Sequence, residues 1–307
     1  MKICVLYGGT SAEREVSLSS GKGIIEALKK KKHEVIGIDF QGTKECLRQI
    51  MDLDVDLFFI GLHGRLGEDG RVQGLLDLLK TPYVGSNVLG SALAMDKARS
   101  KKMFALKGIR VANEKLVERH LFVRANFSHE LSYPVVVKPN HEGSTIGLTI
   151  AQNEKELLEG IDAAFIHDDV VLLEEFISGK EVTVAVMGNK GDVKALPIVE
   201  IVPKNAFYDY ESKYAPGMSE HIVPARVSDE TTKLLQEQSV LAHVALGCDI
   251  YSRVDFIVPN DGSQPVILEV NTLPGMTPTS LYPDAAREIG LSYEDMIEKL
   301  VQLSLQK

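Results

Sequence analysis

Strand-length apolar runs alternate with longer amphipathic segments over the first third of the chain. Buried strands are predicted at 3–7, 34–40 and 56–60, and helices at 17–31 and 71–80. This alternation is typical of an open α/β unit, in which the strands are parallel and the helices cover the sheet. Residues 1–94 are therefore expected to form an N-terminal α/β domain.

The pattern changes after residue 94. Residues 95–181 carry a basic helix, a strand, a second helix and another strand, at 97–107, 133–138, 153–165 and 169–175, which indicates a small α+β domain. Residues 182–307 carry long strands at 182–187 and 193–202, a helix at 228–246, then paired strands and two short helices. Without repeats or a long linker, the three parts are expected to pack around a shared cleft.

Charge and cysteine content limit the classes of partner and the cellular compartment that suit this chain. The chain has 34 basic and 43 acidic residues, and the net charge of −9 would repel nucleic acid or an anionic membrane. No apolar run approaches the ~18 residues that cross a bilayer, and the apolar run after Lys2 is too short for a secretory signal. Cys4, Cys46 and Cys248 are too far apart for a metal or disulfide framework. We expect a cytoplasmic protein with no nucleic-acid or membrane partner.

Four polar residues lie on matching faces of two apolar strands near the C-terminus. Strand alternation places Arg253 and Asp255 on one face of the first strand, and it groups Glu269 with Asn271 in the second. The segment between them is rich in turn formers and predicts a hairpin. A turn centred on Gly262 sets Asp255 opposite Glu269 and Arg253 opposite Asn271.

Two carboxylates that face each other across neighbouring strands repel one another. A hard cation between them would remove the repulsion. Carboxylates with an amide oxygen, and without His or Cys, favour Mg²⁺ or Mn²⁺ over Zn²⁺. Any one of these acids alone is more simply a solvated strand residue, and it is the matched set of four that favours a metal site.

A lysine at the end of a buried strand precedes a loop that contains glycine. Lys138 and the amides of residues 139–147 can contact phosphate oxygens, although Gly-Ser loops are more often plain turns. The two familiar nucleotide signatures are absent. Residues 20–23 lack the leading glycine and the trailing Ser or Thr of a P-loop, and no G-x-G-x-x-G follows the first strand.

An acidic strand end at Glu174 and Glu175 is followed by a second strand near Glu181. Such a segment can line a slot for a base with a carboxylate near the ribose, or it can be a charged strand end at a domain boundary. Loops at 8–13 and 63–74 follow the first and third strands, where open α/β sheets bind ligands. Their glycines also suit plain turns.

Taken together, these segments resemble the D-alanine:D-alanine ligases of the ATP-grasp superfamily. The resemblance rests on stretches in this order: 8–17, 63–74, 91–97, 138–147, 207–214, 253–255 and 269–277. It implies three domains, 1–94, 95–181 and 182–307, with ATP held between the central and C-terminal ones. It also implies that two D-alanines are joined through an acyl phosphate, with ADP and phosphate as products, for peptidoglycan precursor synthesis.

The resemblance assigns the nucleotide side of the site residue by residue. Lys97 and Lys138 would bind ATP phosphates and Glu181 the ribose. The adenine would lie against the segment formed by Glu174, Glu175, Phe176 and Ile177. Two Mg²⁺ or Mn²⁺ ions would be bound by Asp255, Glu269 and Asn271, the set that strand alternation also brings together.

The amino-acid side of the site is assigned in the same way. Glu13 would bind the ammonium of the first D-alanine and hydrogen-bond with Ser144 and Tyr214. The resemblance also implies that Arg253 and the Gly275 amide form the oxyanion site for the tetrahedral intermediate, and that His63 stabilises the side of the site that binds the first D-alanine. Lys213 would contact phosphate. Ser280 and the Leu281 backbone would bind the carboxylate of the second D-alanine. The loop 203–219 would be a lid that excludes water.

Details of the resemblance bear on specificity and packing. Tyr214 favours the dipeptide over a D-alanine:D-lactate product, since relatives that make the depsipeptide tend to replace this tyrosine. Thr145, Leu273 and Ile250 depart from the family pattern, in which position 250 is expected to be glycine or alanine. A homodimer is expected only because the family usually forms one.

The sequence leaves two rival functions to consider. A different ATP-grasp carboxylate–amine ligase would share the nucleotide half, but the substrate-side residues Glu13, Ser144 and Tyr214 argue against it. A nucleotide-binding scaffold without catalysis would not need the paired metal set, so the presence of that set argues against this alternative.

Overall fold

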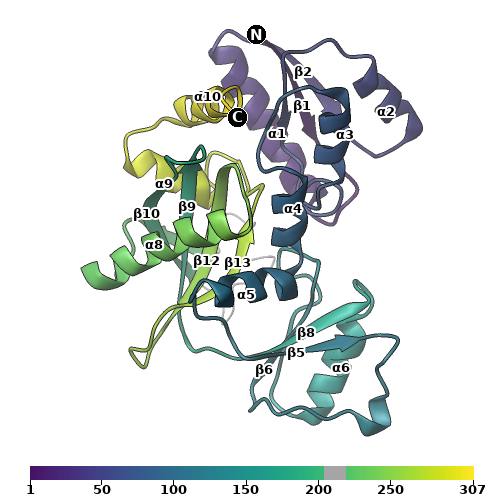
Figure 1. Ribbon diagram of the computed structural model, residues 1–307, viewed down its shortest axis with the longest axis vertical. Coiled ribbons are helices and arrows are strands. Elements are labelled where there is room, and N and C mark those ends of the chain that lie inside the picture. The colour runs from purple at the N-terminus through teal and green to yellow at the C-terminus, as the bar shows by residue number, and fades with distance from the viewer. Residues whose placement is uncertain (204–218) are drawn as a thin grey trace.

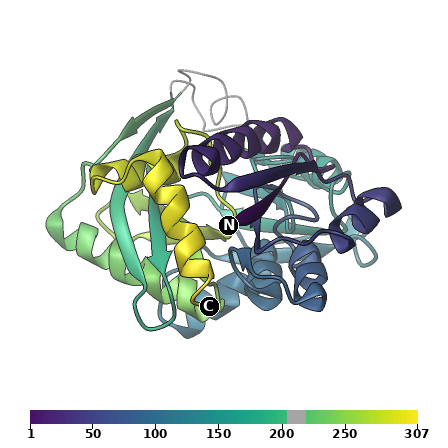
Figure 2. The ribbon, with the colours of Figure 1, turned by 90° about the horizontal axis from the view of Figure 1, so that it is seen from above.

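The computed structural model describes residues 1–203 and 219–307, which form three sheets with flanking helices (Figures 1 and 2). The N-terminal sheet is parallel, as predicted, and has the order β2-β1-β3-β4. Its elements are β1 (Lys2–Tyr7), α1 (Arg14–Lys30), β2 (Glu34–Asp39), α2 (Lys44–Met51), β3 (Leu57–Ile60), α3 (Arg71–Leu79) and β4 (Tyr83–Val84). The short elements α2 and β4 are additions to the sequence prediction.

The central sheet is antiparallel, with the order β5-β8-β6-β7. Its elements are β5 (Glu114–Glu118), a 3₁₀ turn (Arg124–Asn126), β6 (Val135–Pro139), β7 (Thr149–Ala151), α6 (Glu154–Ala164) and β8 (Val170–Glu175). Val135, Val137 and Leu173 of the sheet pack against Leu157 and Ile161 of α6 in a small core of their own. The expected α+β arrangement is confirmed.

The C-terminal sheet is also antiparallel, with the order β11-β10-β9-β12-β13. Its elements are β9 (Gly179–Gly188), β10 (Lys194–Pro203), β11 (Ser219–Ile222), α8 (Asp229–Ala245), β12 (Ile250–Pro259) and β13 (Val266–Asn271). Helices α9 (Leu281–Glu288) and α10 (Tyr293–Ser304) close the chain. Figure 1 shows α8 across one face of this sheet and α9 behind it.

Two consecutive helices, α4 (Val88–Met95) and α5 (Lys97–Leu106), lead from the N-terminal to the central sheet. Asp96 separates them and caps α5, because its side chain accepts a hydrogen bond from the Arg99 amide. Phe104 of α5 lies in the buried cluster of the C-terminal sheet with Val254 and Phe256. The domain ranges 1–94, 95–181 and 182–307 stay predictions.

The N-terminal sheet and the last two helices share one hydrophobic core. Ile24 and Leu28 of α1 belong to the same buried cluster as Ile297 and Leu300 of α10, and Figure 2 shows the two helices side by side. The central sheet has a separate core. Of the helices described, none is long and apolar enough to cross a membrane.

Candidate active site

The three sheets meet at two adjoining cavities of about 310 and about 150 Å³. The larger cavity is lined by residues from all three of the ranges 1–94, 95–181 and 182–307, including Glu13, His63, Glu68, Ser144, Glu181, Arg253, Asp255, Glu269, Asn271, Gly275 and Ser280. The smaller is lined by Lys97, Lys138, residues 142–146, Glu181, Asp255 and Glu269. The structure thus gathers most of the expected site residues at one place.

The hairpin of β12 and β13 has the predicted register, with Asp255 opposite Glu269 and Arg253 opposite Asn271. Asp255 is 5% exposed and its carboxylate is crowded with donors. Arg253 donates to both of its oxygens, from Nε at 2.9 Å and Nη2 at 2.8 Å, and Asn271 Nδ2 donates to Oδ2 at 2.9 Å. Thr183 Oγ1 donates to Oδ1. The guanidinium compensates the buried carboxylate.

Glu269 pairs with the first of the expected phosphate lysines. Lys97 Nζ lies 3.1 Å from Glu269 Oε2 and donates to the Glu142 carbonyl at 2.6 Å. Burial by itself lowers the pKa of Lys97, but Glu269 and more distant carboxylates outweigh burial, so the pKa is raised above its usual value. Lys97 is therefore a cation at the wall of the smaller cavity.

The second phosphate lysine belongs to a buried cluster around Glu174. Glu174 contacts Lys138 Nζ at 2.6 Å and also Lys101 Nζ, and Lys101 lies 3.7 Å from Glu114. Burial opposes ionisation of Glu174, yet Lys138 and Lys101 lower its pKa to about 2. The Glu174 side chain is thus directed at two lysines. Lys101 is an addition to the sequence prediction, one helical turn after Lys97 on α5.

The rest of the expected adenine segment lies apart from the two cavities. Glu175 accepts hydrogen bonds from the Asn113 amide at 3.1 Å and from Asn113 Nδ2 at 2.9 Å. Glu175 and Phe176 line another cavity beside β5, and Ile177 follows on the connection to β9.

Glu13 and Ser144 join the N-terminal domain to the loop that follows β6. Ser144 Oγ donates to Glu13 Oε1, as the resemblance led us to expect, and each residue is 7% exposed. Ser144 and Thr145 have φ of +53° and +64°. This backbone region is rare for residues with a side chain, so the loop is held in a tight conformation. Lys213, Tyr214 and residues 204–218 of the expected lid lie outside the described residues.

His63 holds the segment that carries Gly275. Its Nδ1 lies 2.9 Å from the Leu273 carbonyl, which can only accept, so Nδ1 donates and Nε2 accepts from Ser20 Oγ at 3.0 Å. Ser20 Oγ in turn accepts from the Met276 amide at 3.2 Å. Burial lowers the pKa of His63, which keeps the ring neutral. Both ends of residues 273–276 are therefore fixed through this histidine.

Glu68 lies in the same cavity and is missing from the residues that sequence reasoning singled out. Its carboxylate accepts from the Gly64 amide at 2.6 Å and from the Leu273 amide at 3.3 Å. Burial, then the charge of Glu13, raises the pKa of Glu68 to about 8. Its place in the glycine-rich loop 63–74 was the only signal in the sequence.

The N-terminus of α9 also lines the larger cavity, through Ser280 and Leu281. Ser280 is the residue before the helix, and its Oγ accepts from the Thr277 amide at 3.1 Å. A Cβ at Gly275 would lie 3.2 Å from Ser280 Oγ, so a side chain there would crowd the serine. The amides at the start of a helix are free to bind an anion.

The oxygen ligands expected for a divalent cation fit such an ion. Asp255 and Glu269 line both cavities and Asn271 lines the larger one, and carboxylate and amide oxygens suit Mg²⁺ or Mn²⁺. Within residues 1–203 and 219–307, no group of three or more His, Cys, Asp or Glu side chains is placed so that it could hold a metal ion. The expected set therefore depends on Asn271 as its third ligand.

Comparison with known proteins identifies the family. The profile described as "D-ala D-ala ligase N-terminus" matches residues 2–49 and 40–86, and that described as "D-ala D-ala ligase C-terminus" matches residues 103–302. The D-alanine–D-alanine ligase of Halalkalibacterium halodurans is 69% identical over 307 residues, which cover 100% of both chains. The chain belongs to the D-alanine–D-alanine ligase family.

Solved structures of ligases share the fold. The D-alanine–D-alanine ligase of Bacillus anthracis complexed with ATP superimposes with a TM-score of 0.86 at 34% identity, over 100% of this chain and 98% of that one. The VanG D-Ala:D-Ser ligase of Enterococcus faecalis gives a TM-score of 0.82 at 35% identity, over 99% of each chain. The expected ATP-grasp architecture is thereby confirmed.

Proposed function

We propose that this chain joins two D-alanine molecules into D-alanyl-D-alanine, with ATP converted to ADP and phosphate. One observation carries the proposal. The buried Glu13–Ser144 pair and the Arg253, Asp255 and Glu269 side chains line a single cavity, in a chain 69% identical to a D-alanine–D-alanine ligase. The dipeptide would serve peptidoglycan precursor synthesis.

The reaction has to overcome the poor reactivity of a carboxylate towards an amine. Transfer of the γ-phosphoryl group of ATP to the first D-alanine gives an acyl phosphate, and the second amine then forms the amide as phosphate leaves. The cavity must therefore hold several anions close together. Lys97 and Lys138 on the wall of the smaller cavity, and Arg253 on the wall of the larger one, support this role.

On the nucleotide side, Lys97 and Lys138 would bind phosphates and Glu181 the ribose. The lining of the smaller cavity by all three residues supports the assignment. The adenine would lie against residues 174–177. Since Glu174 is directed at Lys138 and Lys101, its contribution would be to hold those two lysines, and the neighbouring backbone would contact the base.

On the amino-acid side, Glu13 would bind the first ammonium, and Arg253 with the Gly275 amide would stabilise the oxyanion of the tetrahedral intermediate. His63 and Glu68 would hold the Gly275 segment through Leu273 and Met276. Ser280 and the Leu281 amide at the start of α9 would take the carboxylate of the second D-alanine.

Asp255, Glu269 and Asn271 would hold two Mg²⁺ or Mn²⁺ ions. When bound, these ions neutralise phosphate oxygens and align them for transfer. In the structure Asp255 is held by Arg253 and Glu269 by Lys97, so this hairpin already balances its negative charge with two cations.

The deciding experiment is phosphate release from Mg-ATP with D-alanine, L-alanine, D-serine or D-lactate supplied singly and in pairs with D-alanine. D-alanine alone is expected to stimulate release well above the blank and to give the dipeptide by mass spectrometry. The comparable likeness to a D-Ala:D-Ser ligase makes D-serine the relevant competitor. No stimulation by D-alanine, or preferential incorporation of D-serine, would contradict the proposal.

The proposal also includes a cytoplasmic location and assembly into a homodimer. Cys4, Cys46 and Cys248 are buried free thiols, which supports a reducing compartment such as the cytoplasm. A homodimer is expected from the family resemblance alone, and light scattering would measure it.

A further inference from the structure

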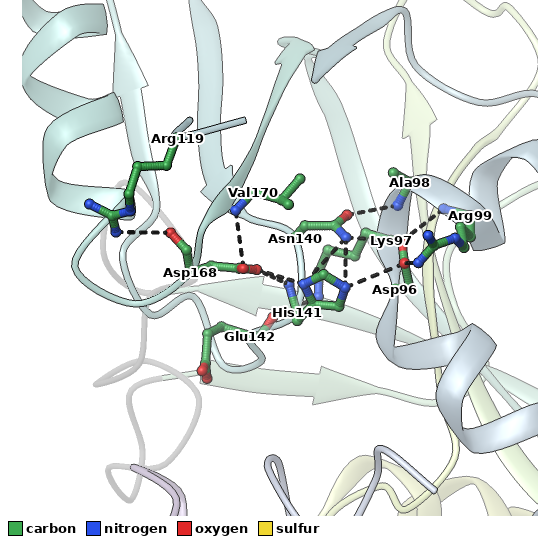
Figure 3. Close-up of polar contacts among 10 residues, drawn as sticks. All are labelled: Asp96, Lys97, Ala98, Arg99, Arg119, Asn140, His141, Glu142, Asp168 and Val170. Carbon is green, nitrogen blue, oxygen red and sulfur yellow. Dashed lines mark hydrogen bonds and ion pairs between the residues drawn. The ribbon is translucent and has the colours of Figure 1, made fainter. Parts of the chain in front are cut away.

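His141 lies between two carboxylates that belong to different elements (Figure 3). Its Nδ1 is 2.8 Å from Asp168 Oδ2, and its Nε2 is 3.3 Å from Asp96 Oδ2. The backbone amide of His141 also donates to Asp168 Oδ2, at 2.8 Å. Asp96 caps α5, whereas Asp168 precedes β8 and accepts from the Val170 amide at 3.1 Å. The ring therefore connects α5 to the central sheet.

The neighbouring residues strengthen the same connection. Asn140 accepts at its carbonyl from the Lys97 amide at 3.3 Å and at Oδ1 from the Ala98 amide at 2.9 Å. Its Nδ2 donates to Asp96 Oδ1 at 2.9 Å, and Lys97 Nζ donates to the Glu142 carbonyl. Residues 140–142, the start of the loop that leads to Ser144, are thus fixed to the first turn of α5, which carries Lys97.

The charges around His141 favour its cationic form. A carboxylate only accepts, so Asp168 at Nδ1 and Asp96 near Nε2 favour a ring in which both nitrogens donate, although Asn140 Nδ2 also lies 3.1 Å from Nε2. The hydrogen bond to Asp168, then that to Asp96, raises the pKa of His141 to about 9. The pKa of Asp168 is lowered, since the bonds from His141 outweigh burial. The other charged or titratable groups on the packed elements are Arg99 on α5, Arg119 after β5, Glu142 and His167 beside the ring, and Arg65, Asp69, Arg71 and Asp169 on the walls of the shared cavity.

This raised pKa gives a definite pH window. The folded-state pKa lies above the ordinary value of 6.5, so the contribution of the cation is complete below pH 6.5. It declines as the pH rises and is lost as the pH passes about 9.

His141 does not line the proposed active site. It lines a separate cavity of about 520 Å³, and it is absent from the residues that line the two active-site cavities. The central sheet, which carries Lys138, has a core separate from the rest of the described chain. Polar contacts such as those of Asn140 and His141 therefore set its position relative to Lys97.

We propose that His141 is a positioning residue for the nucleotide. As a cation between Asp96 and Asp168, it holds the loop 142–147 and the central sheet at the separation from Lys97 that the phosphates require. The inference rests on the proposed function, because it concerns how ATP is held in that reaction.

The test compares wild type with His141→Gln and His141→Arg between pH 7 and pH 10. Gln removes the charge, and Arg keeps it at every pH of the range. At pH 7.5 His141→Gln is expected to raise the KM for ATP about tenfold, with kcat changed less than about twofold, whereas His141→Arg stays within about twofold of wild type. Above pH 9 the wild-type KM should approach that of His141→Gln and leave His141→Arg lower. The ratio of the KM values of two variants at the same pH is independent of the titration of D-alanine itself, because that titration affects both variants equally.

The exposed His120→Gln, on the same domain, is the matched control and should match wild type throughout. An unchanged KM and pH profile in His141→Gln would overturn the proposal. So would a KM raised equally by Gln and Arg, since charge would then be irrelevant. Calorimetric Kd values for Mg-ATP give the same comparison without turnover. Failure of the proposed function is a separate result, namely wild type without D-alanine-dependent phosphate release.

Discussion

At the scale of the residue, Ile250 shows how one backbone angle accounts for a residue preference. It begins β12 with φ of +67°, is fully buried, and lies opposite Gly188. A β-branched residue seldom adopts this angle, because its side chain crowds the backbone. The glycine or alanine expected from the resemblance is thereby explained in part, since glycine adopts this angle freely. Burial of the side chain compensates for the strain in this chain.

Two small substitutions at position 250 separate strain from burial. Ile250→Gly and Ile250→Ala both remove the buried side chain and should both destabilise the protein. The Gly variant should be the more stable of the two by about 1 kcal/mol, because alanine retains the steric penalty at positive φ. Urea unfolding measures the difference.

Ile267 on β13 is the matched control, since it is equally buried and its φ is not positive. There the order should reverse, with Ala more stable than Gly by about 0.5–1 kcal/mol. If the Ala variant were the more stable one at position 250 as well as at position 267, Ile250 would carry no backbone strain.

At the scale of the element, the β12–β13 hairpin was predictable because the side-chain period of a strand is two. Once the turn is assigned to Gly262, that period sets Asp255 opposite Glu269. Lys101 and Glu68 could not be found in this way. Lys101 follows Lys97 by one turn, but only the three-dimensional structure shows that it forms an ion pair with Glu174 of the central sheet. Glu68 likewise depends on Leu273, about two hundred residues away.

The position of Glu269 on the hairpin predicts how its substitution changes turnover. Glu269→Gln removes one negative charge beside Lys97 and an expected metal ligand, so turnover should fall about 10²-fold or more. The fold should change little, because an amide of the same size replaces the carboxylate. D-alanine-dependent phosphate release and thermal unfolding measure the two effects.

Glu230→Gln on the exposed side of α8 is the matched control and should leave both quantities unchanged. Turnover in Glu269→Gln within a few-fold of wild type would remove Glu269 from the proposed metal site.

At the scale of the whole molecule, the described residues form three hydrophobic cores: one joins the first and last parts, one lies against the C-terminal sheet, and a smaller one belongs to the central sheet. The strand and helix pattern predicted the parallel N-terminal sheet but missed β5, β7 and β11. It also did not predict this division, because α5 looks like part of the central domain in sequence and packs on the C-terminal sheet. Sharing of a core between distant segments leaves no periodic signal.

The separate core predicts separate opening of the central domain. Amides of β6 and β8 should exchange with solvent at a lower denaturant concentration than those of β1 and β9, since fewer buried side chains hold the central sheet. Native-state hydrogen exchange by mass spectrometry measures this. Exchange of all four strands in one step would contradict it.

The hydrophobic contact between α1 and α10 has a consequence for synthesis on the ribosome. The apolar face of α1, with Ile24 and Leu28, leaves the exit tunnel well before its cover around Ile297 and Leu300 is translated. During that interval the face has no native partner. The nascent chain must therefore stay unaggregated until α10 emerges, and products truncated before α10 should be the species that chaperones and proteases capture.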